Sequence, residues 1–256
     1  MKYGYMPSFG VDLVSEIQFA SKHFDFVEIT YNPDETYGQS RVRGIKKALE
    51  GIHAIGHLHW GCDFSLASEK EIEKAIKQFG LFSSLGIESV TVHPSFRGSP
   101  WANIIENNVY SMTEIARFCK DTGITVNLEN VEDASSLGLD GLRRLFGAFP
   151  DFHFTLDTGH AEITCGPNGY KKFLASFGQR LSHVHMHYSV SGMDHLPFPE
   201  KSKMAPIQEE IAKTSQSATV TLEIFYKLLN GKRASLDEEE RKGIVLEHLR
   251  YLKHDQ

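Results

Sequence analysis

Eight short runs of apolar and β-branched residues punctuate the chain, and longer stretches with helical spacing separate them. The runs that we expect to form strands lie at 2–6, 25–30, 54–60, 89–93, 124–129, 152–157, 181–187 and 218–225. Between them apolar residues recur three or four positions apart, as at Leu13, Ile17 and Ala20, which is the spacing of one helix face. Strands that alternate with helices predict an α/β protein whose parallel sheet is buried on both faces.

The length of the chain agrees with closure of this sheet. A barrel of eight strand-helix units typically takes about 250 residues, and the chain has 256. No linker rich in Pro, Gly or Ser and no low-complexity tract divides it. We therefore predict a single (β/α)8 TIM barrel over residues 1–256. The charged stretch 236–255, acidic at its start and basic near its end, predicts a closing helix.

Charge and cysteine content restrict the partners and the compartment. A formal net charge of −6 gives no basic footprint of the kind that a duplex-binding surface usually has. Cys62, Cys119 and Cys165 lie far apart, which argues against a disulfide framework and a zinc ribbon. The start of the chain lacks the apolar core of a signal peptide, and no run is long enough to span a membrane. We expect a cytoplasmic protein without a membrane partner.

Six of the predicted strands carry, at or near their ends, a residue that can bind a divalent metal. These residues are His59, His93, Glu129, Asp157, His185 and Glu223. Their separations of 34, 36, 28, 28 and 38 residues match the length of one strand-helix unit. A barrel gathers the carboxyl ends of its strands at one mouth, where unpaired buried carboxylates would be costly without a cation. The pattern predicts a metal site at this mouth.

The residue types limit the metal without identifying it. Three carboxylates and one imidazole, from Glu129, Asp157, His185 and Glu223, suit Mn, Mg, Fe, Co or Zn. Four further imidazoles are available, on His59, His93, His160 and His195. They are enough to complete a second or third metal site, or to act as acid and base beside one metal.

Two local motifs support this site. In "LDTGHA", at 156–161, Asp157 ends a strand and His160 follows three residues later, so that both can face one cavity. In "HVHMHYSVSGMDHLPF", at 183–198, His183, His185 and His187 alternate and therefore point to one side of a strand. We expect His185 to bind metal and the other two to pack around it or support it.

At these motifs the chain resembles the xylose isomerase-like barrel superfamily, which contains sugar isomerases, sugar epimerases and the endonuclease IV DNA-repair enzymes. The resemblance runs along nearly the whole chain and is specific at the strand ends. It implies that "NLEN", "LDTGH", "HVHMH" and "TLEIF" supply the metal ligands shared by the epimerases, Glu129, Asp157, His185 and Glu223. It also implies that His160 contacts substrate.

The endonuclease branch implies more metals. There His59 and His93 resemble two histidines that hold an additional zinc, with Glu129 as the bridge, and His160 and His195 would belong to a third metal. The endonuclease pattern has Asp-x-His, whereas here Asp194 directly precedes His195. The third site therefore requires a loop that brings Asp194 round.

We prefer a metal-dependent isomerase or epimerase that acts on a sugar or sugar phosphate through an enediolate. The resemblance implies that Glu129 and Glu223 remove and return the proton, while His160 and His59 could hold substrate oxygens. Glu28, near the end of the second strand, could bond a sugar hydroxyl or a ligand histidine, or form a salt bridge at the rim.

Two other readings remain open. In the first, two or three metals clamp a phosphodiester, as in an endonuclease IV-like enzyme, and DNA is the partner. The acidic balance of the chain opposes this reading. Arg97 and Trp101, in "HPSFRGSPW", could bind an anion and stack on a ring, or simply belong to a surface loop. In the second reading, the barrel is a binding module with an inert metal.

Overall fold

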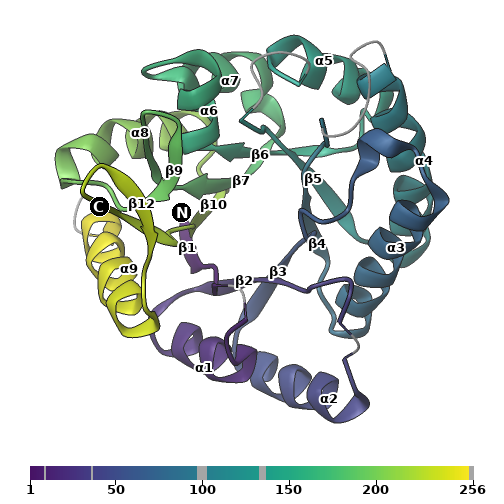
Figure 1. Cartoon of the computed structure of the whole chain (residues 1–256), viewed down its shortest axis with the longest axis horizontal. Helices are drawn as coiled ribbons and strands as arrows, with labels where there is room; N and C mark the ends of the chain where they lie inside the picture. Colours follow the sequence, from purple (N-terminus) through teal and green to yellow (C-terminus); the bar gives the residue numbers. More distant parts are fainter. Residues whose placement is uncertain (9, 36, 97–102, 133–136, 254–256) are drawn as a thin grey trace.

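Eight parallel strands close into a barrel in the computed structural model, which describes all residues except 9, 36, 97–102, 133–136 and 254–256 (Figure 1). The strands are β1 (Lys2–Tyr5), β2 (Phe26–Thr30), β3 (His53–His57), β4 (Ser89–Val92), β5 (Thr125–Glu129), β6 (His153–Asp157), β7 (Leu181–Met186) and β10 (Thr219–Leu222). They follow the order β1-β10-β7-β6-β5-β4-β3-β2 around the ring. The predicted single (β/α)8 TIM barrel is confirmed.

Helices surround the strands on the outside of the barrel (Figure 1). They are α1 (Leu13–His23), α2 (Gln39–Ala48), α3 (Glu69–Ser84), α4 (Ile104–Thr122), α5 (Leu139–Ala148), α6 (Thr158–Cys165), α7 (Gly169–Phe177), α8 (Lys201–Thr214) and α9 (Glu238–Lys253). Apolar residues at helical spacing form the face of each helix that packs on the barrel. In α3 this face buries Ile72, Ala75, Phe79 and Phe82. None of the described helices is both long and apolar enough to cross a membrane.

Polar side chains line the barrel interior beneath the mouth. A buried layer is formed by the residues that lie two positions before His93, Glu129, Asp157, His185 and Glu223 in the sequence. They are Thr91, Asn127, Thr155, His183 and Thr221. The layer is bonded across the barrel, with 3.2 Å between the Oγ1 atoms of Thr91 and Thr155. Hydrogen bonds within this layer therefore support the residues at the strand ends.

Two hairpins at the mouth are absent from the predicted elements. The first is β8 (Tyr188–Val190) with β9 (Met193–Leu196), and the second is β11 (Tyr226–Leu229) with β12 (Lys232–Ser235). Ser191 and Gly192 turn the first, and Asn230 and Gly231 turn the second, all four with positive φ between 52° and 75°. Such two-residue turns match the twist of the paired strands. The chain therefore forms a hairpin at the mouth after β7 and another after β10, each before the next helix begins.

A buried ionic cluster joins the first and last units of the barrel. Arg241 of α9 lies 2.8 Å from a carboxylate oxygen of Glu16 on α1, and Lys242 lies 2.6 Å from the other oxygen. The Tyr5 hydroxyl of β1 bonds both Glu16 and Arg241. The predicted closing helix is confirmed, with acidic residues in its first turn and basic ones in its last. Its charged face is solvated only in part, because Arg241 is buried.

Candidate metal centre

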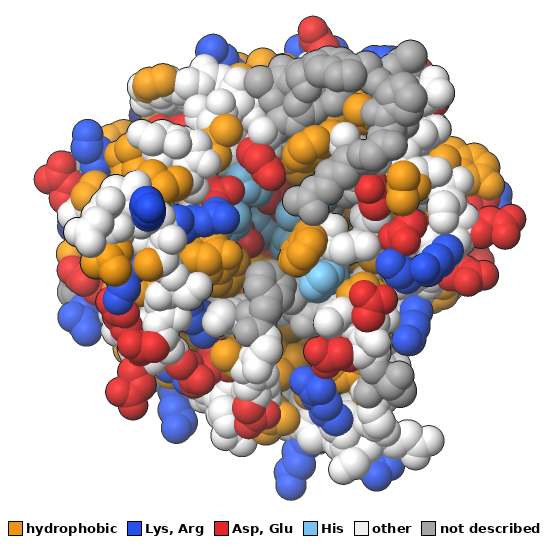
Figure 2. Space-filling model, in the orientation of Figure 1, with side chains coloured by type: hydrophobic (Ala, Val, Ile, Leu, Met, Phe, Trp, Pro, Cys, Tyr) orange, Lys and Arg blue, Asp and Glu red, His pale blue; other side chains and the backbone are white. Residues whose placement is uncertain are grey.

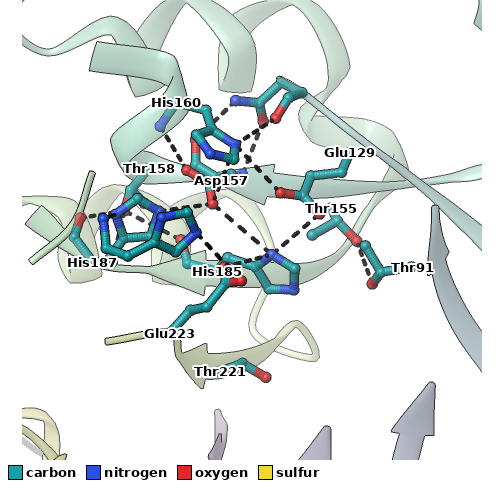
Figure 3. Close-up of polar contacts among 12 residues, drawn as sticks. Thr91, Glu129, Thr155, Asp157, Thr158, His160, His185, His187, Thr221 and Glu223 are labelled. Carbon is teal, nitrogen blue, oxygen red and sulfur yellow. Dashed lines mark hydrogen bonds and ion pairs between the residues drawn. The ribbon is translucent and has the colours of Figure 1, made fainter. Parts of the chain in front are cut away.

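Four residues from neighbouring strand ends converge at the centre of the mouth (Figure 3). Glu129 and Asp157 are the last residues of β5 and β6, His185 is the last but one of β7, and Glu223 follows β10 directly. Each offers one ligand atom, and these atoms all lie within 4.8 Å of one another. All four side chains are buried. The structure thus brings together the four residues that the sequence selects as metal ligands.

The group has the donor atoms and the unmet bonding capacity that a cation requires. Glu129 Oε1, His185 Nδ1 and Glu223 Oε2 are buried and have no hydrogen-bond partner among the described residues. His185 Nδ1 lies 3.2 Å from Glu129 Oε2 and 3.1 Å from Glu223 Oε2. Buried carboxylates gathered in this way are stable only with positive charge between them. Three carboxylates and one imidazole fit a divalent ion such as Mn, Mg, Fe, Co or Zn.

Glu28 fixes the orientation of the ligand histidine. Its Oε1 lies 3.0 Å from His185 Nε2, and its Oε2 lies 2.9 Å from His183 Nε2. A carboxylate only accepts, so each Nε2 donates, and the lone pair of His185 is left on Nδ1, which faces the centre. Of the roles considered for Glu28, the contact with His185, the candidate ligand histidine, is the one that the structure contains. His183 lies below as a supporting group, since its Nδ1 is 2.6 Å from Thr219 Oγ1.

Protons and a metal ion would compete for Nδ1 of His185. Burial disfavours a charged His185, but the carboxylates of Glu129, Glu28 and Glu223 outweigh burial and raise its pKa well above the usual value. Burial likewise raises the pKa of Glu129 and Glu223, but His185 and the other nearby histidines hold both values well below normal. Both carboxylates are therefore ionised at neutral pH, as metal ligands must be.

A second set of ligand atoms adjoins the first through Glu129. His93 Nε2 lies 2.9 Å from Glu129 Oε2, and His57 Nε2 lies 3.5 Å from the same oxygen. His57 Nδ1 donates to the carbonyl of Leu58, at 3.0 Å, so its Nε2 presents a lone pair. His57 Nε2 is buried and lacks a hydrogen-bond partner in the described part of the chain. The sequence interpretation missed His57.

His59, which the sequence selects for this role, lies outside these groups. Strand β3 ends at His57 instead of continuing to 60, so His59 belongs to the turn beyond it. Its Nδ1 accepts the backbone N–H of Gly61 at 3.0 Å, and its ring stacks on Trp60. Its backbone N–H donates to Gln78 at 3.1 Å, which holds the turn. His57 and His59 have the same parity, so strand alternation could not distinguish them.

A third set surrounds Asp157 and contains His160, His187 and His195. Asp157 caps helix α6, because its Oδ1 accepts the backbone N–H of His160 at 2.6 Å. His195 has a left-handed backbone with φ of 55°, and its Nε2 lies 3.4 Å from Glu223 Oε1. Burial disfavours a charged His195, but Glu223 and Asp194 raise its pKa to about 10. The hairpin β8–β9 thus brings His195 to the centre.

His187 supports Asp157 and is poorly suited to bind metal. Its Nδ1 accepts the backbone N–H of His195 at 2.9 Å, so Nε2 carries the hydrogen and donates to Asp157 Oδ2 at 2.9 Å. The ring lies so close to α6 that a Cβ at Gly159 would be 2.0 Å from it. A glycine is therefore required at 159 for this contact.

Asp194 lies beside both His160 and His195. The hairpin β8–β9 brings Asp194 Oδ1 to 3.0 Å from His195 Nδ1 and Oδ2 to 3.7 Å from His160 Nε2. Burial raises the pKa of Asp194, but the hydrogen bonds from both histidines hold it well below its usual range. An ionised carboxylate therefore stands beside both histidines, although it directly precedes His195 in the sequence.

A cavity of about 210 Å³ leads from the surface to these groups. Histidine and acidic side chains lie at the bottom of the hollow in Figure 2. His57, His93, His160, His195 and Glu223 line it, and Trp60, Phe96, Phe225 and Tyr226 contribute aromatic walls. Arg97 and Trp101, for which the sequence suggests anion binding and stacking, lie outside the described residues.

Sequence comparison identifies the class of this barrel. The sequence profile of the xylose isomerase-like TIM barrel family matches residues 17–254, and the chain belongs to this family. Over 120 residues it is 28% identical to an uncharacterized protein of Methanocaldococcus jannaschii, a match that covers 40% of this chain and 38% of that protein.

Solved structures with sequence identities below 25% share the fold. A D-psicose 3-epimerase from Clostridium cellulolyticum H10 superimposes with a TM-score of 0.76 at 17% identity, over 99% of both chains. A 3-keto-D-glucoside 4-epimerase from E. coli gives 0.72 at 15% identity, over 99% of both chains. A family 2 AP endonuclease from Brucella melitensis gives 0.68 at 16% identity, over 88% of this chain and 93% of the other.

Proposed function

We propose that the protein is a divalent-metal-dependent isomerase or epimerase of sugars or sugar phosphates that acts through an enediolate. The observation that carries this proposal is the central group, in which Glu129 and Glu223 approach His185 Nδ1 to 3.2 and 3.1 Å. Each of these two glutamates also keeps one buried oxygen without a hydrogen-bond partner among the described residues. The names of the two epimerases of similar fold agree with this class of reaction.

The positions of the two glutamates suit a proton transfer that changes the configuration at carbon. Strands β5 and β10 are separated in the barrel by β6 and β7, so Glu129 and Glu223 reach the centre from different sides. A bound divalent metal would hold adjacent oxygens of a hydroxy-carbonyl substrate and acidify the carbon next to the carbonyl. One ionised glutamate can then remove the proton from one face, and the other can return a proton to the opposite face.

His160 is placed to bind a substrate oxygen. Its Nδ1 lies 3.2 Å from the carbonyl of Asn130. Its Nε2 lies 3.7 Å from carboxylate oxygens of Glu132 and Asp194, which line the cavity together with His160. Burial disfavours its charge, but Asp157, Asp194 and Glu129 outweigh burial and raise its pKa well above normal. The protonated ring can donate from Nε2 to an oxygen of the enediolate, where negative charge develops.

Hydrogen exchange at carbon tests the proposal directly. The protein, purified without a metal-binding tag, is supplied with ketoses in D2O, and loss of the proton next to the carbonyl is followed by NMR. E223Q should abolish this exchange while the fold remains intact, and E209Q, the same change at an exposed site on α8, should leave it as in the wild type. Unchanged exchange in E223Q would exclude the role given to Glu223.

A multi-metal phosphodiesterase is a second candidate because the three sets of ligand atoms adjoin one another. Glu129 belongs to the central and the second set, and Asp157 belongs to the central and the third set. Elemental analysis of the purified protein separates the two. About one metal per chain supports the isomerase, whereas two or three would favour the hydrolase and direct assays to DNA with abasic sites. The hydrogen bonds of His187 argue against a complete third set.

A further inference from the structure

One arginine borders a cavity that is otherwise lined by acidic, histidine and uncharged side chains. The carboxylates of Asp63, Glu132, Asp194 and Glu223 line the cavity, and among the described residues its lining contains a single Lys or Arg, Arg233. Arg233 lies on β12, in the hairpin that follows Glu223 almost directly. The hydroxyl groups of a neutral sugar can accept hydrogen bonds from a guanidinium, but they supply no opposite charge. The presence of Arg233 at the cavity therefore bears on the charge of the substrate.

Arg233 is held in place before any ligand arrives. Its guanidinium lies over the ring of Tyr226, 4.3 Å from the centroid, and its Nη1 donates to Asp194. The side chain nevertheless remains 42% exposed. A guanidinium has five N–H donors in a rigid plane, and one contact with Asp194 leaves most of them available. Little side-chain entropy would be lost when the remaining donors bind an anion.

Asp194 does not depend on Arg233 alone for compensation of its charge. His195 Nδ1 lies 3.0 Å from Asp194 Oδ1. The partnership with Arg233 can therefore be shared with a ligand without leaving a buried carboxylate unpaired. The same histidine leads back to the chemistry, since its Nε2 lies 3.4 Å from Glu223 Oε1. Arg233 thus stands two side chains away from the proposed proton-transfer group.

We propose that Arg233 binds an anionic group, a phosphate or a carboxylate, at the end of the substrate remote from the reacting carbon. The preferred substrate is then an acidic sugar and not a neutral one. This inference rests on the proposed isomerase or epimerase function and specifies its substrate class. The carboxylates of Asp63 and Glu132, which also line the cavity, repel an anion, so they favour its binding at Arg233 and orient the substrate in one direction.

The test compares ketoses that differ in charge. Carbon-proton exchange is measured with D-fructose, D-fructose 6-phosphate and D-fructuronate for the wild type, R233Q, R233K and K232Q. In the wild type we expect kcat/KM for at least one acidic ketose to exceed that for D-fructose by about 10- to 100-fold, the range of a charge-assisted contact. Which acidic ketose is favoured distinguishes phosphate from carboxylate.

The variants assign the preference to Arg233. R233Q should reduce the ratio of acidic to neutral kcat/KM by the same factor, chiefly through KM, and R233K should restore part of it because it keeps charge without the planar donor set. K232Q, a matched loss of charge at the exposed neighbouring position, should keep the wild-type ratio. A ratio that is equal in the wild type and R233Q would overturn the proposal.

A binding measurement separates this inference from the proposed function. The affinity of the metal-loaded protein for inorganic phosphate is measured by calorimetry for the wild type, R233Q and K232Q. A loss of about 10- to 100-fold in R233Q alone supports the anion site, even if no ketose exchanges its proton and the proposed function fails. Equal phosphate affinity in the wild type and R233Q would overturn the anion site, whatever the exchange experiment shows.

Discussion

Replacement of Glu28 by glutamine should weaken metal binding although Glu28 lies outside the central group of Glu129, Asp157, His185 and Glu223. Two imidazole N–H groups converge on this carboxylate, from His185 at 3.0 Å and from His183 at 2.9 Å. Glutamine has one acceptor oxygen, and its amide nitrogen would face the other N–H as a second donor. If that donor faces His185, the hydrogen of His185 must move to Nδ1, the atom that faces the metal ligands.

The expected cost follows from the role of such supporting groups. Loss of a carboxylate partner of a ligand histidine typically costs 10- to 100-fold in metal affinity, which corresponds to about 1.4 to 2.7 kcal/mol. E28D keeps two acceptor oxygens on a shorter side chain, so it should retain more affinity than E28Q. The difference between the two variants isolates the acceptor geometry from the mere presence of a side chain.

The assay is a competition titration of Mn or Zn against a chromophoric chelator, with thermal unfolding in excess chelator to show that each variant is folded. E209Q, on the surface of α8, is the matched control and should bind metal as the wild type does. If folded E28Q binds metal within about twofold of the wild type, Glu28 does not hold His185 in its ligand tautomer and this reasoning is wrong.

Two further predictions concern stability. E16Q should lower the free energy of unfolding by about 3 to 5 kcal/mol in urea titrations, because it leaves the buried charge of Arg241 without its carboxylate. Burial raises the pKa of Glu16, but hydrogen bonds from Lys242 and Tyr5 outweigh burial and hold the pKa below normal. Because the pKa is lower in the folded state than in the unfolded state, this stabilisation is fully present above the unfolded pKa. It is lost as pH falls through the folded pKa. An E16Q protein with the same free energy of unfolding as the wild type at pH 7 would contradict this role of Glu16. Free metal at 100 times its Kd should add about 2.7 kcal/mol and raise Tm by about 5 to 10 °C over the protein in chelator; an unchanged Tm would argue against a metal site in the folded protein.

Strand and helix periodicity was sufficient to predict the barrel and its central group. Every strand run carries residues of β propensity, and parallel strands must end at the same mouth. The convergence of Glu129, Asp157 and Glu223 followed from the strand ends, and a metal site there stays a prediction because buried carboxylates require compensation of their charge. These inferences need only local pattern and one topological rule.

The length of β3 was not predictable in the same way. The run from 54 to 60 is apolar or aromatic at most positions, so pattern alone extends the strand to Trp60. The chain instead leaves the barrel after His57, where Gln78 of α3 binds the backbone of His59. That contact joins residues 19 positions apart, and no local signal in the strand encodes it.

The two hairpins, by contrast, had a signal that was overlooked. Asn230-Gly231 is the commonest sequence of a two-residue hairpin turn, and Ser191-Gly192 resembles it. A search for these dipeptides after each strand would have placed β8–β9 and β11–β12, and with them His195 and Arg233 at the mouth. The role of His187 could not be found this way, because it depends on a backbone N–H that the hairpin supplies.

The hairpin β11–β12 pairs only with itself, whereas the central carboxylates and His185 lie on or directly beside strands of the closed barrel. The groups that we propose for the reaction and the arginine that we propose for substrate recognition therefore lie in separate segments of the backbone. Evolution could replace this ten-residue segment, Tyr226–Ser235, without moving the backbone that carries Glu129, Asp157 or His185. The same division offers an engineering route, in which grafted hairpins vary the molecules that enter while the reaction performed on them stays constant.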